Sequence, residues 1–318
     1  MASGRLRWHT VEEQEQQQPT LFPVEQLMGH HVGKGEYRGL EFLHVNAKKI
    51  INPVPEQSRM SFRYTINAYR GCSHACGYCY ARPTHEYLDL NIGKDFETKI
   101  VVKVNAVERL RAELSAKSWS GDHITMGTNT DPYQKAEGKY HLTKGIIEVL
   151  TQFKNPFSIL TKSSLILRDL DLLVVANECT DVGINFSIGT LDPEVWRKTE
   201  PGTPHPMRRV EALAKLTEAG IPCGVLVAPI LPGISDSEEQ LREVIEACKK
   251  AGAQFITGIP LHLRPGVKEH YFSFLQEQYP HLLRPYRRLY PRSYLSSRDQ
   301  TEITDRFKKA RNTKRTKD

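Results

Sequence analysis

The sequence lacks any long run of apolar residues: no stretch reaches the roughly 18 residues that a membrane-spanning helix needs. It shows no apolar secretory segment near its first residue, and only 6 of its 318 residues are cysteine. These absences argue against a membrane protein and against a secreted domain built on disulfide bonds. We therefore expect a soluble, cytoplasmic protein without a membrane partner.

Acidic residues are scarce at the C-terminal end, and this accounts for most of the net charge of +7. Residues 306–318 contain seven Lys or Arg and one Asp, so the rest of the chain is close to neutral. Just before them, arginines alternate with tyrosines: Arg284, Tyr286, Arg287, Arg288, Tyr290, Arg292, Tyr294 and Arg298. Arginines beside aromatic rings can pair with phosphates and stack on bases, which favours a nucleic-acid partner. A solvated basic tail behind an amphipathic segment is an equal alternative.

Composition divides the chain into four parts. Residues 1–20 are polar and of low complexity, and are expected to be disordered. Residues 21–63 are rich in glycine and proline and predict a loop-rich N-terminal extension. Residues 64–280 are expected to form the core, and residues 281–318 a basic C-terminal segment and tail.

Three of the six cysteines, Cys72, Cys76 and Cys79, are spaced C-x3-C-x2-C, and no other cysteine occurs before Cys179. Three clustered thiolates suit an iron–sulfur cubane, and a missing fourth cysteine leaves one iron open for chemistry. A structural zinc site completed by His74 or His85 is the alternative. Zinc sites, however, usually pair two C-x2-C knuckles, and the sequence has one.

Strand and helix patterns alternate along the core. Strands are predicted at 64–69, 123–128, 157–160, 182–188, 223–230 and 254–261, and helices at 104–117, 144–153, 168–178, 207–219, 237–251 and 267–279. Strict alternation predicts an α/β fold with a parallel sheet and right-handed crossovers, arranged as a partial (β/α)6 barrel. In a parallel barrel the strand ends meet at one face, so the loops after the strands should gather there.

The cysteine spacing, with an aromatic residue just before the last cysteine, resembles that of the radical S-adenosylmethionine (SAM) enzymes. This resemblance implies the same barrel core and a [4Fe-4S] cluster held by Cys72, Cys76 and Cys79. It implies that SAM binds the open iron and is cleaved reductively to a 5′-deoxyadenosyl radical, which abstracts hydrogen from a substrate. It also implies a reductant such as a flavodoxin or ferredoxin.

The runs 76–80, 187–192 and 200–204 resemble the spore photoproduct lyase-like branch, often labelled "DNA repair photolyase". The resemblance implies cofactor contacts: Tyr78 by the adenine, Thr128 by the methionyl end, Lys162 by its carboxylate and Ser187 by the ribose or carboxylate. Tyr80 is expected to relay a hydrogen atom. Asp131 either contacts the substrate or the cofactor amine, or caps a turn.

One departure concerns position 127, where the lyase carries a hydrogen-donor cysteine and this chain has Gly127. True lyase activity is therefore not expected. Two hypotheses follow. The first is a radical SAM enzyme acting on an unidentified substrate, for which nucleic acid is one candidate. The second is a non-enzymatic iron–sulfur module that binds nucleic acid or acts as a sensor.

Overall fold

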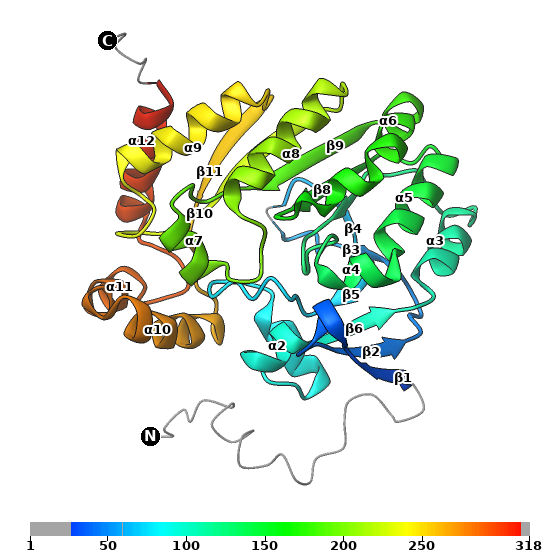
Figure 1. Cartoon of the computed structure of the whole chain (residues 1–318), viewed down its shortest axis with the longest axis horizontal. Helices are drawn as coiled ribbons and strands as arrows, with labels where there is room; N and C mark the ends of the chain where they lie inside the picture. Colours follow the sequence, from blue (N-terminus) through cyan, green and yellow to red (C-terminus); the bar gives the residue numbers. More distant parts are fainter. Residues whose placement is uncertain (1–26, 59, 313–318) are drawn as a thin grey trace.

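The computed structural model describes residues 27–58 and 60–312. Its centre is a seven-stranded sheet in the order β11-β10-β9-β8-β7-β4-β3 (Figure 1). The strands are β3 Ile51–Pro53, β4 Tyr64–Ile66, β7 Ile124–Met126, β8 Phe157–Thr161, β9 Val182–Ser187, β10 Cys223–Ile230 and β11 Phe255–Pro260. β3 pairs antiparallel with β4, and the other six run parallel. Six parallel strands alternating with helices confirm the predicted partial (β/α)6 barrel.

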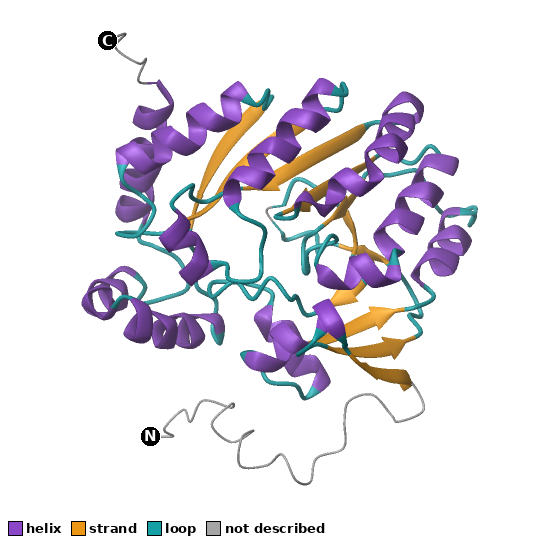
Figure 2. Cartoon of the chain, viewed as in Figure 1, coloured by secondary structure: helices purple, strands orange, loops and turns teal. Residues whose placement is uncertain are grey.

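The helices lie outside the central strands (Figure 2). They are α2 Lys94–Thr98, α3 Ala106–Leu114, α4 Lys135–Tyr140, α5 Leu142–Gln152, α6 Leu170–Cys179, α7 Pro193–Thr199, α8 Pro206–Glu218, α9 Glu238–Lys250, α10 Val267–Gln278, α11 Leu283–Leu289 and α12 Ser297–Asn312. Short 3-10 helices are η2 Gly35–Tyr37, η3 Arg82–Leu88, η4 Ser164–Asp169 and η5 Pro280–Leu282. Ser237 and Gln240 form a capping box at the start of α9.

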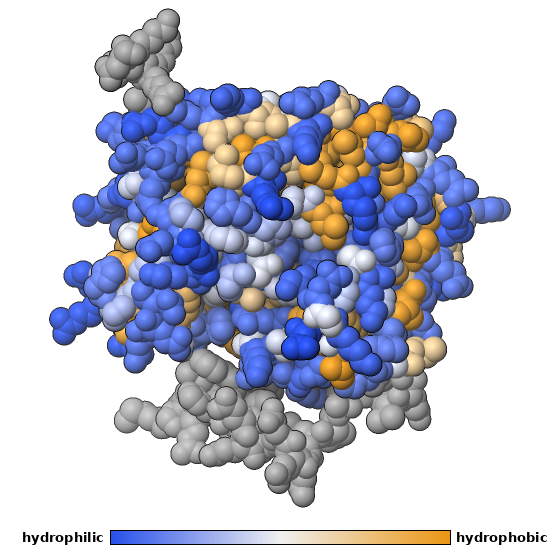
Figure 3. Space-filling model, in the orientation of Figure 1, coloured by the Kyte–Doolittle hydropathy of each residue, from blue (hydrophilic) through white to orange (hydrophobic). Residues whose placement is uncertain are grey.

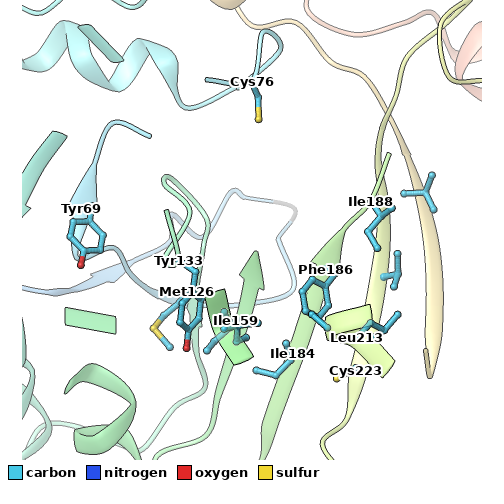
Figure 4. Packing of buried hydrophobic residues seen from close by; sticks show 14 of the residues in the cluster. Tyr69, Cys76, Met126, Tyr133, Ile159, Ile184, Phe186, Ile188, Leu213 and Cys223 are labelled. Carbon is cyan, nitrogen blue, oxygen red and sulfur yellow. The ribbon is translucent and has the colours of Figure 1, made fainter. Parts of the chain in front are cut away.

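Side chains alternate across the central sheet, as strand geometry requires. In β9, Val182, Ile184 and Phe186 are buried, whereas Gly183 and Asn185 are partly exposed. The buried set packs toward the helices, as Figure 4 shows for Ile184 and Phe186 near Leu213. Burial of each such side chain contributes roughly 1.5–3 kcal/mol. The sheet is covered on both faces at β7, where Ile124, Thr125 and Met126 are all buried.

A second sheet, in the order β1-β2-β6-β5, corrects two predictions. Its strands are β1 Leu27–Val32, β2 Glu41–Val45, β6 Lys99–Lys103 and β5 Tyr69–Arg70. The extension predicted to be loop-rich thus carries β1, β2 and β3, and the strand predicted at 64–69 is two strands in two sheets. Because β2 pairs with the distant β6, local patterning could not show this sheet. The disorder predicted for residues 1–20 lies outside the described residues.

As far as Asn312, the C-terminal segment is packed on the core and is not a solvated tail. α12 packs against α9 and β11, and Phe307 lies over Gly258 of β11. Arg306 pairs with Asp236, and Lys309 lies 2.7 Å from Glu238. Residues 313–318 lie outside the described part. In that described part, no helix is long and apolar enough to cross a membrane. Hydrophilic residues cover most of the face seen in Figure 3.

Candidate active site

The loop that carries Cys72, Cys76 and Cys79, called the cysteine loop below, follows β5. Its path depends on one glycine. Gly71 has a φ of +80°, and an added Cβ would lie 2.8 Å from the His85 ring and 3.0 Å from two backbone oxygens. The chain can therefore turn at this point only with glycine, immediately before Cys72. The loop is then fastened by the Cys72 N–H, which donates to the Phe96 carbonyl at 2.8 Å.

A buried arginine holds the middle of the loop. The Arg82 guanidinium donates to the Cys76 carbonyl at 2.9 and 3.2 Å and to the Ile92 carbonyl at 2.9 Å, and it pairs with Glu97. Figure 4 shows Cys76 beyond the carboxyl ends of the strands that carry Ile159 and Phe186, with its sulfur pointing back toward them. The loop thus presents its thiols to the face where strand ends meet.

The three thiols suit an iron–sulfur cluster better than a single ion. All are free, Cys72 and Cys76 are buried, and Cys79 is half-buried. Burial, with the Cys72 thiolate adding to it, raises the pKa of Cys79 to about 11, so the thiolates need a nearby cation to form. In the described residues, no three His, Cys, Asp or Glu side chains converge on one metal ion. A cubane does not require convergence, because each cysteine binds a different iron.

The histidines proposed as a fourth zinc ligand are engaged elsewhere. His74 Nδ1 lies 3.3 Å from Asp131 Oδ2. Burial opposes the charged form of His74, but Asp131 raises its pKa to about 10. His85 Nε2 lies 3.0 Å from the Lys99 carbonyl oxygen. His74 also interacts with the Cys72 side chain, but a protonated imidazole has no lone pair for a metal, so these contacts do not favour the zinc alternative.

Three residues predicted to contact the cofactor meet around one carboxylate. Lys162 Nζ lies 2.6 Å from Ser187 Oγ and 2.9 Å from Glu200 Oε1, and the Tyr78 hydroxyl donates to the same Glu200 oxygen. Lys162 Nζ also lies 5.6 Å from the centre of the Tyr78 ring. Glu200 and Lys162 both influence the thiol of Cys76 electrostatically, so this group is next to the cysteine loop.

The carboxylate at the centre, Glu200, is buried and ionised. Arg209 pairs with its other oxygen at 2.5 Å and donates to the Ser187 carbonyl at 3.1 Å. Burial opposes ionisation, but Arg209, Lys162 and the Tyr78 hydroxyl hold the pKa of Glu200 well below its usual range. Sequence reasoning missed both residues as site residues. Glu200 lay within a run that was noticed, whereas Arg209 carries no signal because it sits in an ordinary helical pattern.

Asp131 is fully occupied by neighbouring groups. Its oxygens accept hydrogen bonds from the Thr161 hydroxyl at 2.7 Å, the Lys162 N–H at 2.7 Å and the Tyr133 N–H at 2.9 Å, in addition to the His74 contact. It thereby joins the cysteine loop to the end of β8. These contacts favour the turn-capping interpretation and give Asp131 a positioning role; its role in catalysis stays a prediction.

Tyr80 and Thr128 form a second group. The Tyr80 hydroxyl donates to the Thr128 carbonyl, and Thr128 Oγ1 accepts from Asn67 Nδ2 at 3.4 Å. Just before Thr128, Gly127 has a φ of +91°, and a Cβ there would lie 1.9 Å from the Leu160 carbonyl oxygen. Position 127 therefore has no room for any side chain, a cysteine included.

Comparisons with known proteins agree with this geometry. Residues 66–246 match the radical SAM superfamily. An uncharacterised protein of Mycobacterium tuberculosis is 45% identical over 257 residues, which are 81% of this chain and 76% of that protein. An uncharacterised protein of Methanocaldococcus jannaschii is 33% identical over 199 residues, 63% of this chain and 71% of that protein. The chain therefore belongs to the radical SAM superfamily and is an enzyme.

Spore photoproduct lyase is similar in fold and more weakly in sequence. The Bacillus subtilis protein is 30% identical over 186 residues, 55% of this chain and 48% of that protein. The structure of spore photoproduct lyase complexed with dinucleoside spore photoproduct superposes with a TM-score of 0.62 and 17% identity, covering 90% of this chain and 84% of that one. The shared fold confirms the predicted likeness to this branch.

Proposed function

We propose that this chain binds a [4Fe-4S] cluster through Cys72, Cys76 and Cys79 and SAM beside it. When bound, the two supply a reductive cleavage that gives a 5′-deoxyadenosyl radical able to abstract hydrogen from a substrate. The observation that carries the proposal is the meeting of Tyr78, Lys162, Ser187 and Glu200 next to the cysteine loop. Superfamily membership makes the alternative, a non-enzymatic module, the weaker hypothesis.

The residues around Glu200 would orient the cofactor. The Lys162 ammonium has three N–H donors, of which two are used by Ser187 and Glu200, while the third faces the Ala228 carbonyl at a weak 3.4 Å. That third donor would hold the SAM carboxylate, with the Ser187 hydroxyl beside it. Glu200 holds Lys162 in place for this contact.

The substrate step differs from that of the lyase. Position 127 admits no thiol, so a hydrogen-returning cysteine cannot stand there. We propose that Tyr80, beside Thr128, relays the hydrogen atom. The reaction then ends without the cysteine that returns a hydrogen atom in the lyase. A nucleic-acid substrate remains a prediction. Tyr286 and Tyr290 are buried, so two of the three tyrosines on which the nucleic-acid prediction was based cannot contact a partner.

The test is anaerobic reconstitution with iron and sulfide, followed by dithionite and SAM, with 5′-deoxyadenosine as the product measured. Wild type should form it and Cys76→Ala should not. Cys179→Ala is the matched control, because Cys179 is exposed on α6 and belongs to no cluster. A reconstituted wild-type cluster that yields no 5′-deoxyadenosine would contradict the proposal.

A further inference from the structure

Three aromatic side chains stack in series, beginning with Tyr80 at the end of the cysteine loop. The rings of Tyr80 and His262 stack with centroids 6.1 Å apart and 29° between their planes. The rings of His262 and Tyr294 stack at 5.3 Å and 12°. We call Tyr80, His262 and Tyr294 the aromatic column. Its inner member, Tyr80, directly follows Cys79 in the sequence and is 37% exposed, and its outer member, Tyr294, is 64% exposed.

The column is held in place by its surroundings rather than by its own stacking alone. The Leu263 N–H donates to the Ser293 carbonyl at 2.7 Å, and the Tyr290 hydroxyl donates to the Leu261 carbonyl at 2.8 Å. These bonds tie the strand-end loop that carries His262 to the segment that carries Tyr294. Burial, assisted by Arg264, lowers the pKa of His262, so its ring is uncharged at neutral pH and free to stack.

The outer end of the column is exposed although its sequence neighbours are packed. Tyr286 and Tyr290 are buried and stack on each other at 5.7 Å, so they serve the core. Tyr294 meets His262 on one side, and no other ring or cation contact of Tyr294 occurs in the described part of the chain. Core packing therefore explains the first two tyrosines and leaves the third without a structural purpose.

Arginines lie on both sides of Tyr294 in the sequence. Five exposed arginines lie on α11, on the start of α12 and between them: Arg284, Arg287, Arg288, Arg292 and Arg298. Within residues 27–58 and 60–312, none of them makes a salt bridge or a side-chain hydrogen bond. Arg264, also exposed, acts electrostatically on both Tyr80 and His262. Exposed arginines without ion pairs are complementary in charge to a partner rich in carboxylates.

We propose that this arginine surface docks a small acidic electron-transfer protein, and that the aromatic column carries its electron to the cluster. The inference rests on the proposed function, which requires one electron per cleavage. The reduced carrier loses one electron and the cluster gains it, and no bond forms or breaks. Stacked rings shorten the gaps that an electron must cross between the protein surface and Cys79. A nucleic acid would fit the arginines too, but it would leave the contact between the column and the cysteine loop unexplained.

The arginines are tested first, with anaerobically reconstituted holoenzyme and reduced flavodoxin as the probe. Binding is followed by anisotropy of labelled flavodoxin, and cluster reduction by stopped-flow absorbance. The double variant Arg288→Glu/Arg292→Glu should weaken binding and lower the second-order reduction rate by about tenfold or more at low salt, and the difference should shrink at high salt. Arg38→Glu, an exposed arginine far away in the chain, should change neither.

The column is tested separately through the rate within the complex. Tyr294→Ala should lower the limiting reduction rate by flavodoxin while binding changes by less than about twofold, and Tyr294→Phe should restore the rate because the ring remains. Reduction by dithionite, a small molecule that needs no docking, should be much less affected by every variant. Equal limiting rates for wild type and Tyr294→Ala would overturn the role of the column.

Two further outcomes separate the hypotheses. If the arginine variant loses binding of a labelled oligonucleotide but keeps flavodoxin binding and reduction, the surface belongs to nucleic acid and the proposal is wrong. If wild type makes no 5′-deoxyadenosine with dithionite, the proposed function fails. The anisotropy measurement then still decides whether the arginines dock the carrier.

Discussion

Replacing Glu200 with alanine tests the reasoning about the site most directly. Glu200 is 4% exposed and faces two cations, Arg209 at 2.5 Å and Lys162 at 2.9 Å. Both partners have little access to water, so neither can regain its hydration when the carboxylate is removed. Removing one partner of a buried pair typically costs about 3–5 kcal/mol. We expect Glu200→Ala to lose at least about 3 kcal/mol of unfolding free energy.

The measurement is urea-induced unfolding of cluster-free protein, followed by circular dichroism. The dependence of the unfolding free energy on urea concentration should be the same in wild type and variant. Asp305→Ala is the matched control. It breaks the pair with Lys308, whose members are 60% and 57% exposed, and it should cost less than about 1 kcal/mol. If Glu200→Ala does not fold, Glu200→Gln keeps the shape and removes only the charge. A loss no larger than that of the control would refute the claim that this carboxylate organises the site.

Three further predictions concern other parts of the chain. Gly127→Ala should destabilise the fold by more than about 3 kcal/mol in the same unfolding assay, whereas Gly121→Ala, with a similar φ of +79° and nothing within 4 Å, should cost about 1–2 kcal/mol. In cluster-free protein at pH 8, a thiol reagent should label the exposed Cys179 quickly and leave Cys248 unlabelled until unfolding, since burial raises the pKa of Cys248 to about 12; equal labelling by mass spectrometry would contradict this. Burial lowers the pKa of His85 to about 4. Below about pH 6.5 the unfolded chain therefore binds a proton at this residue and the folded chain does not. The free energy of unfolding then falls by about 1.4 kcal/mol per pH unit down to pH 4. Above pH 6.5 this histidine contributes nothing, and His85→Gln should remove that part of the acid slope.

Much of the barrel was predictable from local pattern. From β7 to β11, strands that are neighbours in the sheet are also neighbours in sequence, so alternation with helices was enough to order them. The three cysteines were equally readable, because their spacing lies within eight residues and needs no tertiary information. The capping box of Ser237 and Gln240 is likewise a local contact, between residues three apart in the sequence.

The second sheet was not predictable, for a physical reason. β2 pairs with β6 some 58 residues further along the chain, and β5 is only two residues long. A local pattern cannot show a pairing over that distance, and a strand of two residues is too short to give a pattern. The same limit applied to the tyrosines near the C-terminus. A sequence shows that Tyr286, Tyr290 and Tyr294 alternate with arginines, but only packing decides which rings enter the core.

The sequence by itself determined the class of chemistry, because iron–sulfur clusters are held by cysteine thiolates and three cysteines stand close together in the chain. Only the tertiary structure decided how the site is organised. It placed Glu200 and Arg209 beneath Lys162, and it occupied Asp131 with four partners. It also closed position 127 to any side chain, and it stacked His262 between Tyr80 and Tyr294. Those arrangements join residues from distant strand ends, and such contacts exist only once the parallel strands have come together.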